Sequence, residues 1–316
     1  MQRDDFKGEA KEIIRMKNLR FQYDGQAVLE GISTSLNGPK IYGLLGRNGA
    51  GKTTLLSLIN GYINGEKGSL KIFGQDPFDN RRVSSNVSYH GKPNFKEVYN
   101  KVKEQLALHQ KYRQNFDMDY AKKLLEDFQI PLNKNIRKLS QGKQSALNGI
   151  LGLASGTAVT LLDEVYAGMD APARTRMYNA ILNEQTRRPR LMILSTHMVS
   201  EMDYLFDHVL ILKDGKLVED AAVDEILEKG ITITGVKAKV DGFTKDLNVL
   251  KKEGLGNIQK AMVYEKIKEE DYNRGLDMGL EFDTTPMQEL FIHLTEEGSG
   301  DMKGKGKDRN RREDEK

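Results

Sequence analysis

Apolar and polar residues alternate over the first part of the chain, as they do in half-buried strands. The alternation over Ile13 to Phe21 and over Val28 to Leu36 predicts two antiparallel strands, with the turn signal Asp24-Gly25 between them. The short apolar run from Lys40 to Leu45 predicts a buried strand, and Lys52 to Ile63, after a glycine-rich stretch, predicts a helix. We therefore expect a β-rich entry layer followed by a strand, a loop and a helix.

The pattern changes in the middle of the chain. Ser69 to Phe73 and Val83 to Tyr89 predict further strands, whereas Phe95 to Gln110 and Tyr120 to Phe128 have helical periodicity and abundant charge. These helices predict a helical subdomain at about residues 94–155, inserted into the main domain.

Strands then alternate with helices. Ala158 to Leu162, Leu191 to Ser195 and Val209 to Leu212 predict strands, and Ala171 to Glu184 and Met198 to Leu205 predict helices. This alternation is typical of an α/β fold with a parallel sheet. We expect the main domain to span residues 12–230.

A smaller accessory α+β domain is expected over residues 231–296, ending in a helix after Thr284-Thr285-Pro286. This domain could dimerise, regulate or brace the main domain, and bracing is the simplest expectation. Gly298 to Lys316 contains no aliphatic or aromatic residue except Met302, so residues 297–316 are expected to form a disordered charged tail.

Composition narrows the possible partners. The chain has 316 residues with 49 Lys and Arg against 46 Asp and Glu, and this balance gives no argument for direct nucleic-acid binding. It has no cysteine, which suits a reducing cytoplasm. The polar start from Met1 to Lys11 predicts no secretory signal, and polar residues within the uncharged run from Gln144 to Leu162 predict no membrane span.

The glycine-rich stretch matches the complete P-loop pattern, and it reads Gly46-Arg47-Asn48-Gly49-Ala50-Gly51-Lys52-Thr53. Glycines let backbone N–H groups turn around phosphate oxygens, and the following helix presents the positive end of its dipole to them. Lys52 is expected to reach the β- and γ-phosphates, the Thr53 hydroxyl to ligate Mg²⁺, and Thr54 to contact the nucleotide as well.

Two carboxylates follow a buried strand directly, at Asp163 and Glu164. Strand ends often carry solvated acids, but in a P-loop protein this is where Mg²⁺ is held. We expect Asp163 to hold the metal or its water, and Glu164 to act on the attacking water as general base.

Three further motifs complete the set, and they read Leu139-Ser140-Gln141-Gly142-Lys143-Gln144, Gly168-Met169-Asp170 and Ser195-Thr196-His197. With these motifs in this order, the chain resembles the ATP-binding subunits of ABC transporters over about Ile13 to Lys229. The signature motif, together with Glu289 to Glu296, looks most like exporter-type bacterial subunits, including antibiotic-resistance systems.

The resemblance implies a P-loop NTPase fold of the ABC type and an ATPase that uses ATP and Mg²⁺. It implies that Tyr23 stacks on adenine, that Ser140 and Gly142 face the γ-phosphate bound by another subunit, that Asp170 belongs to the nucleotide site, and that His197 contacts the γ-phosphate. An ordinary strand-end tyrosine and a core histidine are the alternatives for Tyr23 and His197. The implied partners are an integral membrane permease and a second ATP-binding subunit, with the chain peripheral on the cytoplasmic face of the membrane.

Two departures from the family pattern bear on activity. Gln141 stands where the signature usually has a glycine, and the family glutamine at the entry to the helical insert is missing from Val87 to Lys92. That entry loop, at Tyr89 to Asn94, is also where the membrane partner is expected to dock. A nucleotide-binding module with little turnover is therefore one alternative. A soluble regulatory ATPase acting on the ribosome or on DNA is another, although the chain has one P-loop and no long coiled-coil pattern.

Overall fold

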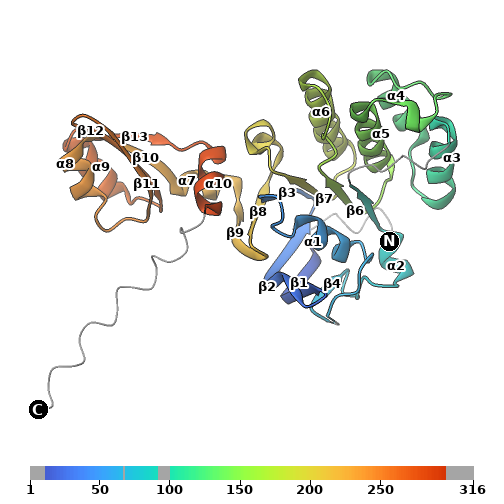
Figure 1. Cartoon of the computed structure of the whole chain (residues 1–316), viewed down its shortest axis with the longest axis horizontal. Coiled ribbons are helices and arrows are strands. Elements are labelled where there is room, and N and C mark those ends of the chain that lie inside the picture. The colour runs from blue at the N-terminus through green and yellow to red at the C-terminus, as the bar shows by residue number, and fades with distance from the viewer. Residues whose placement is uncertain (1–10, 67, 92–99, 297–316) are drawn as a thin grey trace, which may run out of the picture. The chain divides into compact units, whose positions relative to one another are not determined.

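The computed structural model describes residues 11–66, 68–91 and 100–296 (Figure 1). The chain separates into two compact units, residues 1–223 and 224–316. Residues 224–230, which the sequence assigns to the main domain, group with the second unit here. The predicted tail at 297–316 and residues 92–94 of the predicted docking loop lie outside the described residues. Within the described ranges, none of the helices has the length and apolar character needed to cross a membrane.

An antiparallel sheet opens the first unit and confirms the predicted entry layer. Strands β1 (Lys11–Tyr23) and β2 (Gln26–Gly38) pair around Asp24 and Gly25, whose φ angles of 46° and 83° suit a tight hairpin turn. Strand β4 (Leu70–Ile72) pairs with the other edge of β1.

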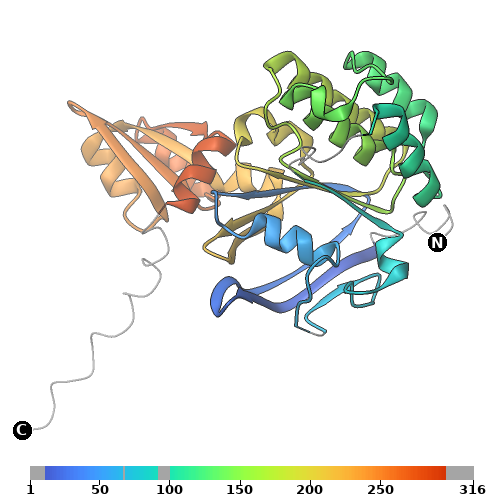
Figure 2. The same ribbon diagram turned by 45° about the vertical axis from the view of Figure 1, so that its right-hand side comes forward.

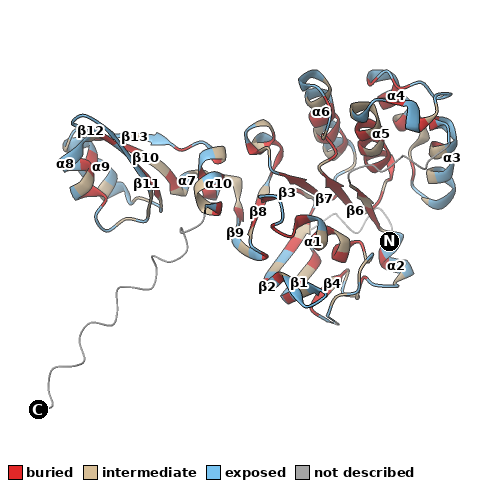
Figure 3. Ribbon diagram, in the orientation of Figure 1, coloured by how far each residue is buried: buried red, intermediate tan, exposed pale blue. Residues whose placement is uncertain are grey.

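A six-stranded sheet forms the centre of the first unit, in the order β5-β6-β7-β3-β8-β9. All neighbours are parallel except β8 and β9, and β6 and β7 are buried along their whole length (Figure 3). Burial on both faces is typical of parallel strands and explains their uninterrupted apolar runs. The strands are β3 (Lys40–Gly46), β5 (Val87–His90), β6 (Val159–Asp163), β7 (Leu191–Thr196), β8 (His208–Lys213) and β9 (Lys216–Ala222).

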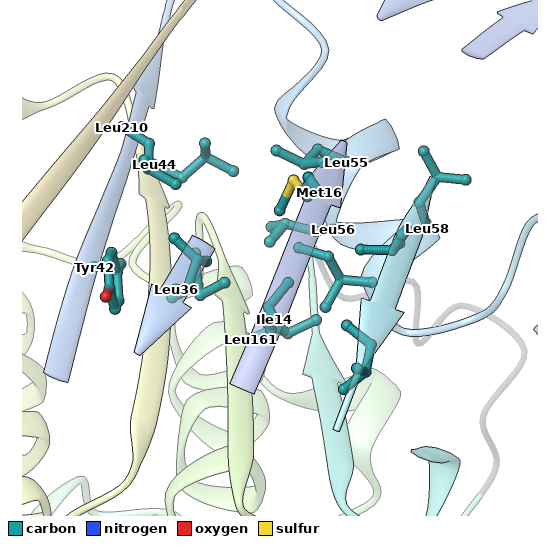
Figure 4. Close-up of a cluster of buried hydrophobic side chains, with 14 of the residues drawn as sticks. Ile14, Met16, Leu36, Tyr42, Leu44, Leu55, Leu56, Leu58, Leu161 and Leu210 are labelled. Carbon is teal, nitrogen blue, oxygen red and sulfur yellow. The ribbon is translucent and has the colours of Figure 1, made fainter. Parts of the chain in front are cut away.

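Helix α1 (Lys52–Ile59) lies between the two sheets (Figure 2). Its buried face, including Leu55 and Leu56, packs with Ile14 and Met16 of β1 and with Leu161 of β6 in one apolar cluster (Figure 4). Each such side chain contributes about 1.5–3 kcal/mol when fully buried, so this cluster holds the strand, loop and helix in place.

The helical subdomain occupies one side of the first unit (Figure 1). It contains α3 (Val102–Tyr112), α4 (Met118–Asp127) and α5 (Gln141–Ala154), and α5 packs against α4 and α6 (Ala171–Arg187). The predicted helices are therefore present, although residues 95–99 lie outside the described part of the chain.

Three local predictions are wrong. The helix predicted to Ile63 ends at Ile59, because Gly61 adopts a left-handed conformation with φ 72°. The strand predicted from Val83 begins only at Val87, since the Asn80 side chain accepts two backbone N–H groups and caps a short helix, α2 (Arg81–Ser84).

The third concerns the predicted helix Met198 to Leu205, which consists instead of two 3₁₀ turns, Val199–Glu201 and Asp203–Leu205. The Asp203 side chain accepts the N–H of Tyr204, and such local bonds compete with an α-helix.

The second unit has its own antiparallel sheet, in the order β11-β12-β10-β13, and its own apolar cluster around Ile233, Phe243 and Val263. The predicted last helix is present after Pro286, with Leu290 and Phe291 buried. The elements are α7 (Val223–Lys229), β10 (Gly230–Val236), α8 (Lys237–Phe243), β11 (Val249–Leu255), β12 (Ile258–Tyr264), α9 (Glu269–Asp277), β13 (Glu281–Thr284) and α10 (Met287–Thr295).

Candidate nucleotide site

A cavity of about 600 Å³ opens beside the ends of β3 and β6. Ligands of α/β proteins bind at the carboxyl ends of parallel strands, and this volume is in the usual range for a ligand pocket. The residues that line it are Tyr23, Val28, Asn48, Gly49, Gly51, Lys52, Thr53, Thr54, Tyr89, Asp163 and Glu164. Nine of these eleven residues are predicted site residues, so the structure brings most of the expected nucleotide site together.

The P-loop connects β3 to α1. Gly49 and Gly51 have φ angles of 84° and 101°, and a Cβ on Gly51 would lie 2.7 Å from the Leu29 side chain and 3.1 Å from the Val28 carbonyl. A side chain at position 51 would therefore clash with β2. The loop delivers the N-terminus of α1 to the cavity, where its free N–H groups suit an anion.

Lys52 is 7% exposed, and its ammonium group donates to the carbonyls of Gly46 (2.7 Å) and Arg47 (3.1 Å). Burial lowers the pKa of Lys52, while the negative charges of Glu164 and Asp163 raise it. An ammonium group has three donors, and the loop carbonyls take two of them. The third donor and the positive charge fit a phosphate oxygen.

Asp163 ends β6 and is 5% exposed. Its Oδ2 accepts from the hydroxyls of Thr53 (2.9 Å) and Tyr89 (3.0 Å), and its Oδ1 accepts from the hydroxyl of Ser195. A hydroxyl and a carboxylate are hard oxygen ligands of the kind that Mg²⁺ prefers. The described residues contain no group of three His, Cys, Asp or Glu side chains placed to hold a metal. The Thr53 hydroxyl and the Asp163 carboxylate fit an ion that keeps several waters and shares nucleotide phosphates, as Mg²⁺ does.

Glu164 follows in a left-handed conformation with φ 50°, which costs a residue other than glycine about 1 kcal/mol. Its Oε1 lies 2.9 Å from Nδ1 of His197. His197 stands beyond the end of β7, next to β6 in the sheet, and this adjacency brings the two side chains together. A carboxylate at the cavity wall with an imidazole beside it is the arrangement that proton abstraction from water needs.

Tyr23 is 48% exposed and lines the cavity, with its ring edge-on to Phe21 at 4.8 Å between centroids. Its position fits the predicted contact with adenine. Gly46 and Arg47 serve the site through their carbonyls, while Ala50 is buried beneath the loop.

Ser140, Gly142 and Asp170 do not line this cavity. Ser140 caps α5 by accepting the N–H of Lys143 at 3.4 Å, and Asp170 caps α6 by accepting the N–H of Ala173 at 2.8 Å. A Cβ on Gly142 would lie 2.6 Å from the carbonyl of Gly168, so the signature motif packs directly on the aspartate loop.

Two tyrosines in or beside the site were not predicted. Tyr89 reaches Asp163 from β5, the strand in which the family glutamine is missing. The hydroxyl of Tyr166 donates to Thr196 at 2.6 Å, next to His197. Burial, with the negative charge of Asp163, raises the pKa of Tyr89, so its hydroxyl remains a donor. Tyr89 is the last residue of a predicted strand, and Tyr166 comes soon after the predicted carboxylates Asp163 and Glu164, so a position at a strand end was the available signal.

Comparisons with known proteins agree with this geometry. A family model described as "ABC transporter" matches residues 29–167. The chain is 28% identical over 254 residues to the ABC transporter ATP-binding protein YtrB of Bacillus subtilis, covering 80% of this chain and 85% of that protein. It is 30% identical to the bacitracin transport ATP-binding protein BcrA of Bacillus licheniformis, covering 69% of this chain and 72% of that protein.

Solved structures support the fold. An ATP-binding subunit of an ABC transporter superposes with a TM-score of 0.60 at 23% identity, covering 68% of this chain and 91% of that chain. A nucleotide-free ATP-binding cassette superposes with a TM-score of 0.58 at 17% identity, covering 67% and 92%. The predicted P-loop fold of the ABC type is confirmed. Because a relative with 30% identity is covered over most of its length and the cavity carries the P-loop and the acidic strand end, the chain belongs to the ABC transporter family as one of its ATP-binding subunits, which are ATPases coupled to transport.

Proposed function

We propose that the chain hydrolyses ATP as a pair of identical or closely related subunits and thereby drives a separate membrane permease, in export or antibiotic resistance. It works on the cytoplasmic face of the membrane. The observation that carries the pairing is that Ser140 and Gly142 lie outside the cavity that holds Lys52 and Asp163. One chain therefore supplies only part of the residues that the family motif assigns to one nucleotide.

Binding of ATP begins at the P-loop. Lys52 directs its remaining donor to a phosphate oxygen, and the N–H groups at the start of α1 face the other oxygens. Tyr23 offers its exposed ring to the adenine, and Val28 lies beside it in the cavity wall. These contacts fix the triphosphate with its terminal phosphate toward Asp163 and Glu164.

Thr53 and Asp163 would hold Mg²⁺. The ion, when bound, supplies positive charge to the phosphate oxygens. Glu164 takes a proton from the attacking water, and His197 holds the Glu164 carboxylate at 2.9 Å. A general base of this kind contributes about 10²–10⁴-fold to the rate.

The second copy completes the site. Its Ser140 and Gly142, at the N-terminus of α5, meet the terminal phosphate across the interface, so ATP favours the closed pair over the open one. Cleavage of the terminal phosphate removes this preference. Opening and closing of the pair is then the motion that the permease receives.

The experiment compares two separate variants, Glu164→Gln and Lys52→Ala. We expect Glu164→Gln to lose steady-state phosphate release by at least about 10²-fold, because the base is gone, while ATP doubles its mass in light scattering. Lys52→Ala is the matched control, since it should neither bind ATP nor change mass. A Glu164→Gln protein that releases phosphate at the unaltered rate would exclude Glu164 as the base. One that keeps the mass of a single chain with ATP would refute the pairing, and an unaltered chain without phosphate release would favour a binding module.

Export is supported by the relative BcrA, which is named for bacitracin transport. The family role as an ATP-binding subunit requires a membrane-spanning partner. The permease and its substrate can be identified only in cells, because the isolated chain carries neither.

A further inference from the structure

Asp163 is held from both sides of its strand. It ends β6, which lies between β5 and β7 in the sheet. Tyr89 of β5 donates to Oδ2 at 3.0 Å, and Ser195 of β7 donates to Oδ1. The two carboxylate oxygens are thus fixed by hydroxyls from two different strands, which sets the plane of the carboxylate.

The strand register explains why Tyr89 faces the P-loop. Tyr89 pairs with Leu161, so it shares a face of the sheet with Leu161 and with Asp163 two residues further along β6. His90 pairs with Leu162 and points to the other face, where Nδ1 lies 3.3 Å from the Asn148 side chain. Only Tyr89 of this strand end is therefore directed at the cavity.

The Tyr89 ring is held independently of its hydroxyl. It packs against the apolar cluster beneath α1, and its centroid lies 5.7 Å from that of Tyr62 in an edge-on contact. Removal of the hydroxyl alone should leave the ring in place. The bond to Asp163 can thus be tested without disturbing the cavity wall.

We propose that Tyr89 is a positioning residue whose hydroxyl orients the Asp163 carboxylate for the divalent cation. The inference rests on the proposed cation site of Thr53 and Asp163. Thr53 also donates to Oδ2, at 2.9 Å, but it is itself a proposed cation ligand. The Tyr89 hydroxyl donates to the same oxygen, and unlike Thr53 it is not a ligand of the ion. The carboxylate therefore keeps its orientation whether or not the ion is bound.

The test measures binding of a fluorescent ATP analogue to the full chain, first in EDTA and then as Mg²⁺ is added. For Tyr89→Phe we expect affinity in EDTA within about twofold of the unaltered chain, because the P-loop contacts remain. The Mg²⁺ concentration at half effect should rise about tenfold, since a hydrogen bond to a charged group is worth about one order of magnitude in an equilibrium constant. Tyr89→Met, an apolar side chain with freer packing, should show the same shift.

Tyr42→Phe is the matched control. It also loses the hydroxyl of a buried tyrosine, one that bonds to the Asn37 backbone away from the cavity, and it should leave the Mg²⁺ midpoint unchanged. Thr53→Ala separates the two proposals. If Thr53→Ala leaves the Mg²⁺ dependence intact, the cation site itself is wrong.

If Thr53→Ala abolishes the Mg²⁺ effect, the cation site stands and the role of Tyr89 is tested by itself. Three results would then overturn that role. In the first, Tyr89→Phe has the same Mg²⁺ midpoint as Tyr42→Phe. In the second, the midpoint falls, which would mean that the hydroxyl competes with the ion. In the third, affinity in EDTA and in Mg²⁺ weakens by one common factor, which would mean that Tyr89 only shapes the cavity.

Discussion

Single residues beside the cavity hold the histidine that faces Glu164. The Tyr166 hydroxyl, in a buried side chain, donates to the Thr196 hydroxyl at 2.6 Å, and the same hydroxyl is also hydrogen-bonded to the backbone of His197. The Thr196 oxygen in turn accepts the N–H of Met198 at 2.9 Å. These bonds hold the residues on both sides of His197. They therefore fix the backbone from which the imidazole reaches Glu164.

Tyr166→Phe should therefore slow hydrolysis without weakening ATP binding. Loss of the hydroxyl's hydrogen bonds to Thr196 and to the His197 backbone is expected to lower kcat about threefold to tenfold, while affinity for the fluorescent analogue in EDTA stays unchanged. Steady-state phosphate release and equilibrium titration measure the two quantities separately.

Tyr178→Phe serves as the comparison for this substitution. Tyr178 is also buried, and its hydroxyl lies 3.4 Å from the Glu201 carboxylate rather than beside His197. The kcat of Tyr178→Phe should equal that of the unaltered chain. Equal losses in both variants would show that Tyr166 acts through general packing and not through His197.

The part of the site that lies close together in sequence was predictable. The strand ending at Gly46, the glycines at 49 and 51 and the helix from Lys52 are encoded by one apolar run and one loop pattern. Asp163 and Glu164 were found in the same way, as acids at the end of an apolar run.

Contacts between elements were not predictable from local pattern. Tyr89 meets Asp163 only because β5 pairs with β6, and Tyr166 meets Thr196 only because β6 pairs with β7. The order of strands in a sheet depends on long-range packing, which the period of apolar residues does not contain. The short helix at Arg81 was missed for a different reason, because one capping side chain, Asn80, determines it.

Two histidines lie where β5 and α3 meet. His90 of β5 and His109 of α3 have ring centroids 6.0 Å apart, and His109 lies 5.7 Å from Phe116. Burial, followed by the charge of His109, lowers the pKa of His90 to about 3. Burial and the nearby Arg113 lower the pKa of His109 to about 4.

This junction should make the first unit less stable in mild acid. The unfolded chain protonates these histidines near their ordinary pKa of 6.5, whereas the folded chain does so only near 3 to 4. Between these values the unfolded state binds more protons, so the free energy of unfolding falls as pH falls below about 6.5. The loss is about 1.4 kcal/mol per pH unit for each histidine.

The variant His109→Phe isolates one of the two groups, because it keeps an aromatic ring beside Phe116 and cannot titrate. Between pH 7.5 and pH 5, its unfolding free energy should fall by about 2 kcal/mol less than that of the unaltered chain. Urea titrations at the two pH values give the difference. Identical pH dependence in both proteins would mean that His109 is not held neutral in the folded state.

The chain combines a nucleotide cavity with motifs that lie outside it. All the residues that line the cavity belong to the first unit, and the second unit has a separate sheet and apolar cluster. The signature motif at Ser140 packs on the aspartate loop of its own chain. In the proposed pair, a second chain supplies the rest of the site through its Ser140 and Gly142.

If ATP turnover by this pair drives export, loss of ATP binding should make cells sensitive to what is exported. We expect cells that carry Lys52→Ala in place of the native gene to tolerate at least about fourfold less of an exported antibiotic, because the variant lacks the ammonium group that holds the triphosphate. Minimum inhibitory concentrations measure the change. Lys40→Ala, the same substitution at the opposite end of β3, should leave tolerance unaltered. If all strains tolerate the antibiotic equally, while the purified chain still hydrolyses ATP and forms a pair, the proposed role in resistance is wrong. The subunit would then drive a permease for another substrate.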